Sequence, residues 1–184
     1  QFGYKAALIL LVSVLSCVLS EYLFESLMGK PVTVSDGSAL VTGMILGLNM
    51  PPAIPLWIPF LGGVFAVIVV KQLYGGLGQN FMNPALAARC FLLISFAGKM
   101  TTFTYNDAVA GPTPLASLKA GEAVDLTAMF IGKISGTIGE VSVIALLIGA
   151  AYLLFRKVIS IRIPAAYIIT VAAFVFVFGR HDLT

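Results

Sequence analysis

The sequence predicts an all-α, polytopic membrane protein in which at least one helix breaks inside the membrane. Apolar residues make up 59% of the 184 residues and charged residues 10%, whereas a soluble domain carries about 25% charged residues. The mean hydropathy is +1.02. Long apolar stretches alternate with turns rich in proline and glycine. This pattern excludes a disordered chain, a collagen-like chain and an ordinary water-soluble enzyme.

Charge and cysteine content exclude further classes. The net charge of +3 is spread over the whole length and forms no basic face, so no nucleic-acid partner is predicted. Cys17 and Cys90 lie in apolar runs without a CxxC pair, so we expect small packing residues. A metal–sulfur site completed by another chain is the alternative. The single histidine, His181, makes no catalytic triad or metal motif, so no metal is predicted.

The first predicted membrane helix covers residues 6–28, between Lys5 and Lys30. It is long enough to cross about 30 Å of hydrocarbon. Glu21 and Glu25 are four residues apart and therefore share a helix face. They lie near the membrane surface, or they form an ion-conducting or quinone-facing acid pair. Both are therefore candidate ion-coupling residues.

A half-helix is predicted near residues 39–50, after a polar turn at 31–38. The apolar stretch is too short to span a bilayer, and the prolines from Pro51 onward stop it. Broken helices are tolerated where protein or water covers the open backbone, and they commonly build ligand sites. Gly43 and Gly47, four residues apart, predict a close helix contact.

Two further helices follow. The apolar stretch at 55–73 ends near Lys71. The glycine-rich turn after it lacks a dinucleotide-binding pattern. Asn83 is a predicted helix cap and Pro84 a first helical residue, so the next helix covers about 85–96.

Arg89 places a charge inside this predicted helix. A charge there is costly and usually has a partner. Arg89 faces a ligand phosphate or a carboxylate, or it snorkels to the membrane interface.

The composition divides the chain into three parts. Residues 1–97 hold the helices described above. Residues 98–139 form the most polar segment and are the best candidate for an aqueous site. Residues 140–184 hold two more predicted membrane helices, at 140–155 and 164–179.

The loop between these last helices holds the densest positive cluster, Arg156, Lys157 and Arg162. The positive-inside rule places this loop in the cytoplasm and the 98–139 segment outside it. When the direction of each preceding predicted helix is alternated from this loop back toward the N-terminus, Lys71 also falls on the cytoplasmic side.

The polar segment contains the sequence Asp107-Ala-Val-Ala-Gly-Pro-Thr113. It resembles the flavinylation motif of FMN transferases, in which an Asp precedes Ser/Thr-Gly-Ala-Thr and the final Thr receives FMN as a phosphoester. Asp107, Gly111 and Thr113 keep this spacing, with Ala110 and Pro112 in place of the usual Ser/Thr and Ala. Gly111 leaves the backbone open around the hydroxyl, and Pro112 stiffens it. An ordinary turn is the alternative.

Four ordered stretches extend the resemblance: Gly75-Gly-Leu-Gly-Gln-Asn80, Phe81-Met-Asn-Pro-Ala85, Leu92-Leu-Ile-Ser-Phe96 and Met100-Thr-Thr102. Together with residues 36–43 they resemble the RnfD family, the D-type subunits of the Rnf complex, over essentially the whole chain. The NqrB family, the B-type subunits of the sodium-pumping NADH:quinone reductases, shares the pattern more loosely.

The resemblance implies a fold and a function. The family is a two-repeat bundle with broken helices in each half, so this chain is expected to continue into a second repeat. The implied function is electron transfer in a redox-driven Na⁺ or H⁺ pump that couples ferredoxin and NAD⁺. The implied setting is multi-pass, in the cytoplasmic membrane of a prokaryote, with the Thr113 segment extracytoplasmic.

The implied cofactor is FMN bound covalently to Thr113, with a second, non-covalent flavin as a further option. Asp107 and Gly111 are read mainly by an FMN transferase. Arg89, Asn80 and Asn83 are candidates for flavin contact or for lining a pathway. The implied partners are membrane and peripheral subunits that carry flavin and Fe–S centres, besides the transferase and the lipid bilayer.

Three alternatives stay open. The chain is a B-type subunit of a sodium-pumping NADH:quinone reductase, a urea-channel-like transporter without flavin, or a scaffold subunit that has lost its cofactor.

Overall fold

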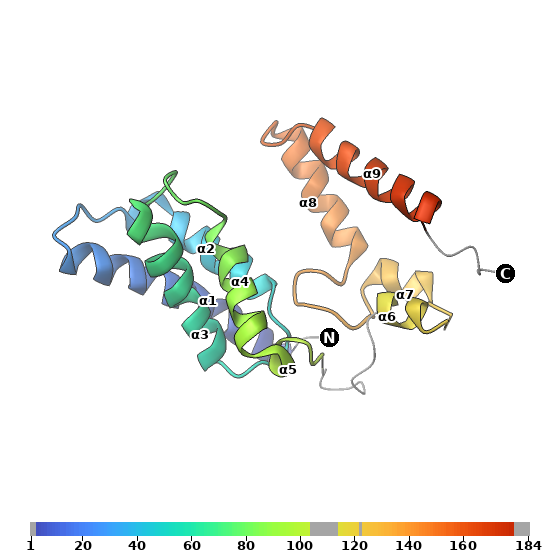
Figure 1. Ribbon diagram of the computed structural model, residues 1–184, viewed down its shortest axis with the longest axis horizontal. Helices are drawn as coiled ribbons and strands as arrows, with labels where there is room; N and C mark the ends of the chain where they lie inside the picture. The colour runs from blue at the N-terminus through green and yellow to red at the C-terminus, as the bar shows by residue number, and fades with distance from the viewer. Residues whose placement is uncertain (1–2, 104–113, 122, 179–184) are drawn as a thin grey trace. The chain divides into compact units, whose positions relative to one another are not determined.

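The computed structural model describes residues 3–103, 114–121 and 123–178, and every regular element among them is a helix (Figure 1). This confirms the predicted all-α fold for the described part of the chain. The chain divides into two compact units, Gln1–Ser142 and Val143–Thr184. Within these described ranges, two helical stretches are long and apolar enough to cross a membrane, and both belong to the first unit.

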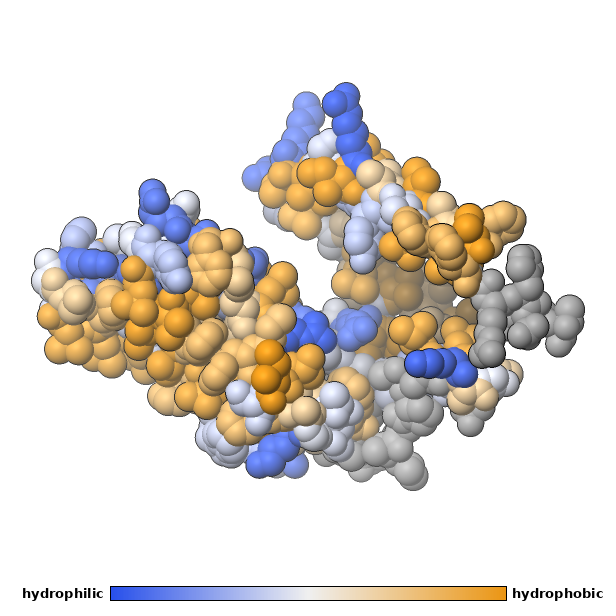
Figure 2. All heavy atoms as spheres, viewed as in Figure 1, coloured by the Kyte–Doolittle hydropathy of each residue, from blue (hydrophilic) through white to orange (hydrophobic). Residues whose placement is uncertain are grey.

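Helix α1 (Gly3–Leu27) buries polar side chains and exposes leucines. Its buried residues recur every three or four positions and are Ala6, Ile9, Ser13, Ser16, Cys17, Ser20, Glu21 and Glu25. Its exposed residues include Leu8, Leu11, Leu15, Leu19 and Leu23. A helix of a soluble protein shows the opposite distribution. The exposed face therefore suits lipid, and Figure 2 shows apolar residues over much of the visible surface of the first unit.

Helix α2 (Ser38–Leu48) packs closely on α1. The predicted glycine contact is confirmed, because a Cβ on Gly43 would lie 2.5 Å from the Val14 Cα and one on Gly47 would lie 3.2 Å from the Leu10 Cα. The helix has 11 residues, and at about 1.5 Å per residue it cannot cross the hydrocarbon. Its bounds agree to within two residues with the half-helix predicted near residues 39–50.

A distant segment closes the carboxyl end of α2. The N–H of Ile138 donates to the carbonyl of Met50 at 3.1 Å, and the N–H of Gly139 donates to the carbonyl of Leu48 at 2.8 Å. Carbonyls at the end of a helix need such partners, because lipid supplies none. The 137–140 segment therefore makes the break after α2 tolerable.

The predicted 55–73 span is one continuous helical stretch made of α3 (Trp57–Val64), η2 (Phe65–Lys71) and η3 (Gln72–Tyr74). η2 is π-helical and η3 is a 3-10 turn. The stretch ends at Gly75, whose φ of 112° favours glycine. Short π-helical segments often occur at functional sites.

Helix α4 (Pro84–Ser95) begins as the sequence predicts. The Asn83 Oδ1 accepts hydrogen bonds from the N–H groups of Ala85 at 3.0 Å and Leu86 at 3.2 Å. The missing N–H of Pro84 costs nothing at this first position. α4 packs on α2, α3 and η2 and is followed by the short α5 (Ala97–Met100).

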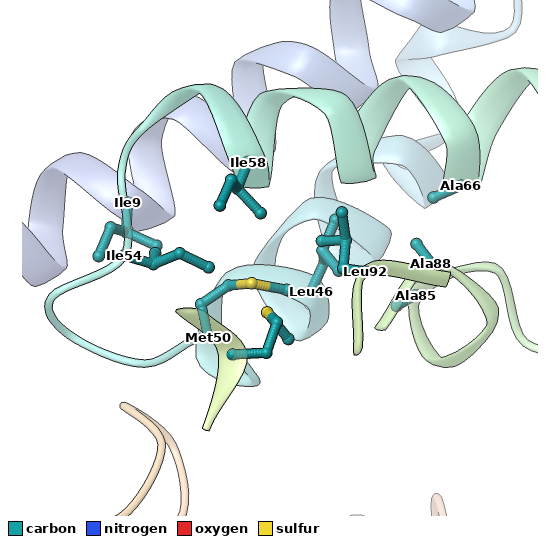
Figure 3. Packing of buried hydrophobic residues seen from close by; sticks show 10 residues of the cluster. Ile9, Leu46, Met50, Ile54, Ile58, Ala66, Ala85, Ala88 and Leu92 are labelled. Carbon is teal, nitrogen blue, oxygen red and sulfur yellow. The ribbon is translucent and has the colours of Figure 1, made fainter. Parts of the chain in front are cut away.

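The core of the first unit lies between these helices (Figure 3). Its buried apolar residues are Ile9, Leu46, Met50, Ile54, Ile58, Ala66, Ala85, Ala88, Leu92 and Met100. They come from α1, α2, α3, η2, α4, α5 and the loop after α2, so this core joins the whole bundle.

The remaining described helices are α6 (Pro114–Lys119), α7 (Leu126–Ile131), α8 (Val143–Phe155) and α9 (Arg162–Phe178). α8 begins later than the predicted 140–155 stretch, and with 13 residues it is shorter than the about 20 residues of a full span. α9 has 17 residues, at the lower end of the range of about 17–25 residues for a span.

Candidate functional site

The predicted attachment site lies outside the described residues. Asp107, Gly111, Pro112 and Thr113 all fall in the 104–113 gap. The other candidates, in α1, in the 75–83 turn and in α4, are described and fall into two clusters.

The first cluster is built around a buried ion pair. The Lys71 ammonium, at the end of η2, contacts the Glu21 carboxylate on α1. Lys71 is 2% exposed and Glu21 is 0% exposed. The second carboxylate oxygen of Glu21, Oε2, is buried and has no hydrogen-bond partner among the described residues. A buried pair of this kind holds both charges only as long as both partners stay in place.

Gln72 links this pair to Glu25. Its Nε2 donates to Glu21 Oε1 at 3.0 Å and to Glu25 Oε1 at 2.9 Å. Glu25 also accepts from the Thr33 N–H at 2.8 Å and from the Thr33 hydroxyl at 2.6 Å. Both glutamates are thus buried within the protein and joined by one amide, while their role in ion coupling stays a prediction.

Lys71 and Gln72 were not predicted as partners of the glutamates. The end of an apolar stretch is the usual place for a lysine that marks the cytoplasmic side, and the sequence favours that interpretation of Lys71. Its charge is instead compensated inside the bundle, so it gives no support to that topology. The signal that could have identified it is a lysine inside an apolar stretch when another predicted helix carries two acids.

Ser38 connects the ion pair to the turn before α2. The Lys71 ammonium donates to the Ser38 hydroxyl, and that hydroxyl donates to Asp36 Oδ1. The Ser38 N–H also donates to Asp36 Oδ1 at 2.7 Å. These bonds from Ser38 lower the pKa of the Asp36 carboxyl below its ordinary value, with a smaller contribution from Lys71. Asp36, which ends the short turn η1 (Val34–Asp36), is therefore a stable anion close to the buried pair.

A cavity of about 280 Å³ adjoins this cluster and is lined by residues that include Asp36, Ser38, Lys71, Asn80 and Asn83. Asn80 donates to the Met82 carbonyl at 3.2 Å, while its buried Oδ1 has no partner in the described part of the chain. Asn83 caps α4 through its own Oδ1. Both predicted asparagines thus lie at the same cavity as Lys71.

The second cluster surrounds Arg89. Its Nη1 donates to Asn49 Oδ1 at 2.6 Å, just after the carboxyl end of α2. A cation near this end is favourable because of the helix dipole. Arg89 thus binds a neutral amide of the bundle, while its role toward a ligand or at the membrane interface stays a prediction. A cavity of about 340 Å³ lies beside it, and its lining includes Thr137 and Glu140.

Comparison with known proteins gives the family. The model of the NQR2, RnfD, RnfE family matches residues 1–184. The chain is 47% identical to the D-type subunit of the Na(+)-translocating ferredoxin:NAD(+) oxidoreductase complex of Acetobacterium woodii, over 99% of this chain and 60% of the relative. It is 37% identical to the D-type subunit of the proton-translocating ferredoxin:NAD(+) oxidoreductase complex of Clostridium ljungdahlii, over 97% and 59%.

The B-type subunit of a Na(+)-translocating NADH-quinone reductase from Neisseria meningitidis is 40% identical over 72% of this chain and 36% of the relative. The chain thus spans about 60% of the length of the D-type relatives that it matches. The match of the family model over the full sequence agrees with the helical, lipid-suited fold. The chain belongs to the NQR2, RnfD, RnfE family.

Proposed function

We propose that this chain is the membrane electron-carrier subunit of an ion-translocating ferredoxin:NAD⁺ oxidoreductase complex and that it carries FMN on Thr113. The observation that carries the proposal is the match to D-type relatives over nearly the whole chain, together with the spacing of Asp107, Gly111 and Thr113. The proposed partners are membrane and peripheral subunits with flavin and Fe–S centres, and an FMN transferase that reads Asp107 and Gly111. The proposed location of Thr113 is the extracytoplasmic side of a prokaryotic cytoplasmic membrane.

The described residues next to the attachment point suit a phosphoester. A hollow of about 260 Å³ is lined by Pro114, directly after Thr113, and by polar residues that include Ser117, Asp125, Lys133 and Ser135. The ammonium and the two hydroxyls are groups that stabilise a phosphate anion, whereas the Asp125 carboxylate accepts from the N–H groups of Thr127 and Ala128. Bound FMN would supply the redox chemistry, while this chain would attach it, orient it and neutralise its charge.

Two further assignments belong to the proposal. Glu21 and Glu25 are the proposed ion-coupling acids, supported by their burial and by the partners described above. Asn80, Asn83 and Arg89 are proposed to contact flavin, including a second, non-covalent flavin, or to line a pathway. The cavity beside Arg89 has a volume within the range of about 300–1,000 Å³ that is typical of ligand sites, and the one beside Lys71 lies just below it.

Flavin fluorescence of the denatured chain in a gel, with peptide mass mapping, tests the proposal. We expect the full-length chain to fluoresce when an FMN transferase is co-expressed and Thr113→Ala to be dark. Thr102→Ala is the matched control, because the Thr102 hydroxyl donates to the Gly98 carbonyl of its own segment. A dark wild-type chain, with a transferase active on a second substrate, would remove the carrier role.

A B-type quinone reductase subunit is the second candidate, favoured by the 40% identity to the relative from Neisseria meningitidis. It predicts covalent flavin as well, so the electron acceptor separates the two. Reduction of NAD⁺ by ferredoxin in the purified complex supports the first candidate, and reduction of a quinone by NADH supports the second. A urea-channel-like transporter or a cofactor-free scaffold predicts no flavin at all.

A further inference from the structure

One ammonium in the first cluster lies between a buried carboxylate and an exposed one. Lys71 contacts Glu21 directly and reaches Asp36 through a single hydroxyl, that of Ser38. Glu25 and Lys30 are charged groups nearby, and the buried Cys17 thiol is a further titratable group close to Glu21 and Lys71. Lys30 donates to the Gln72 carbonyl at 3.5 Å and lies over the Phe24 ring.

Glu21 needs a cation for as long as it is ionised. It is fully buried, and its Oε2 has no partner in the described structure. An uncompensated carboxylate in such a place is strongly unfavourable. Glu25 differs, because the Thr33 N–H, the Thr33 hydroxyl and Gln72 satisfy its oxygens. Glu21 is therefore the carboxylate whose charge depends on the Lys71 ammonium.

Asp36 is a second carboxylate with which the Lys71 ammonium can pair. It stays ionised for the reasons given above, and it lines the 280 Å³ cavity together with Ser38 and Lys71. The helix that carries Lys71 is irregular there, with a π-helical segment that ends at this residue and a 3-10 turn after it. Space, a second anion and an irregular backbone thus occur at the same point.

We propose that Lys71 is a movable counter-ion that alternates between Glu21 and Asp36, and that a monovalent cation, Na⁺ or a proton, replaces it on Glu21. The inference rests on the proposed ion-coupling role of Glu21. It adds that the Lys71 ammonium and the incoming cation cannot pair with Glu21 at the same time. In one state the ammonium neutralises Glu21. In the other the incoming cation does, and the ammonium pairs with Asp36, so neither state leaves a buried charge uncompensated.

Labelling with a hydrophobic carbodiimide, mapped by mass spectrometry, reads the state of Glu21 in the intact complex. The reagent adds to a protonated carboxyl group and spares a carboxylate that is paired with Na⁺ or with an ammonium. We expect Lys71→Met to label faster at Glu21 than wild type. Since Na⁺ no longer competes with the ammonium, it should protect this variant at a concentration about tenfold lower or less. Lys71→Arg should behave as wild type, and so should Lys5→Met, a basic residue outside the cluster.

Asp36→Asn provides a test that does not depend on the folding of the Lys71 variant. The Asn side chain keeps an oxygen that can accept from Ser38, so the start of α2 is preserved. The Asn side chain lacks the negative charge, so Lys71 loses its alternative anionic partner. We expect protection by Na⁺ to require a higher concentration than in wild type, the opposite of the shift in Lys71→Met.

The two cation sources give different results. With choline as the control salt, Na⁺-specific protection identifies Na⁺ as the occupant. If Na⁺ and choline act alike and the pH midpoint of labelling shifts in opposite directions in the two variants, the occupant is a proton. Identical Na⁺ and pH midpoints in wild type and both variants would overturn the proposal. Normal ion pumping by Glu21→Gln would instead show that Glu21 has no role in ion coupling. Such a result would not contradict an exchange of cations measured at Glu21 in the wild-type protein.

Discussion

Gln72 brings two carboxylates together without adding a charge. Its single amide donates to both Glu21 and Glu25, at 3.0 and 2.9 Å. An arginine in its place would neutralise the second carboxylate as well, whereas the amide leaves one ammonium for two anions. The cluster is therefore held in shape by hydrogen bonds, with Thr33 and Gln72 satisfying Glu25 and the one ammonium pairing with Glu21.

Removal of Lys71 alone should destabilise the protein far more than removal of the whole pair. Lys71→Met leaves the Glu21 carboxylate buried without its counter-ion, which typically costs about 3–5 kcal/mol. Glu21→Gln combined with Lys71→Met removes both charges and should recover most of that loss. Chemical unfolding of the four members of the double-mutant cycle in detergent, in choline buffer at neutral pH, measures the difference. Equal stabilities of the single and double variants would contradict the prediction.

The sequence predicts some of these residues and not others. Glu21 and Glu25 follow from helical spacing, and Asn83 follows from the Asn-Pro signature of a helix start. Lys71 does not, because a lysine at the end of an apolar stretch usually faces the membrane interface. Its partnership depends on which helices pack together, and no local pattern records that.

At the scale of elements, the contact between α1 and α2 depends on the absence of side chains. Gly43 and Gly47 let α2 approach the α1 backbone, and Gly63 approaches Ser16 so closely that a Cβ there would lie 2.6 Å from the hydroxyl. Ser16 in turn donates to the Phe60 carbonyl at 2.6 Å. Close backbone approach replaces large apolar side chains as the source of packing energy, as is usual between membrane helices.

Gly43→Ala should therefore separate α1 from α2. The new Cβ would lie 2.5 Å from the Val14 Cα, a backbone atom that cannot turn aside. We expect a loss of about 1–3 kcal/mol from this overpacking, measured as a lower unfolding midpoint in detergent. Gly149→Ala on α8 is the matched control, since a Cβ there meets nothing within 4 Å. An unchanged midpoint for Gly43→Ala would show that the helices are packed more loosely.

Helix positions were predictable where signals are local. The half-helix at 39–50 and the helix at 85–96 agree with α2 and α4 to within two residues, because prolines and an asparagine cap mark their ends. No proline or capping residue in the sequence indicates the π-helical segment η2. This segment changes the register of side chains around Lys71, and it packs against α1, α3 and α4.

At the scale of the whole molecule, α1 buries polar side chains and exposes leucines. This distribution predicts at which positions of α1 a charged side chain is tolerated. Leu15 is mid-helix and 47% exposed, whereas Leu27 is at the helix end and 83% exposed. Leu15→Arg would place a cation near the centre of the hydrocarbon, at a cost of about 2.5–3.5 kcal/mol on insertion scales. Leu27→Arg can extend to the interface. A glycosylation-based insertion assay should show reduced insertion for the first variant only.

The class of the molecule was the easiest property to predict, since composition alone indicates a helical membrane protein. The closure of α2 by the 137–140 segment was not predictable, because backbone groups far apart in the sequence carry it. The sidedness of the loops and the place of Thr113 stay predictions, since both depend on the membrane and on residues 104–113.

The hydrogen bonds that close α2 also constrain how the protein is made. The carbonyls of Leu48 and Met50 find their partners at Gly139 and Ile138, about 90 residues further along the chain. A ribosome that adds about 5–20 residues per second needs roughly 5–20 s to supply them. During that interval the nascent half-helix has an open end that lipid cannot satisfy. We therefore expect its insertion to be delayed, or its open end to be sheltered by the insertion machinery, until the closing segment has left the ribosome.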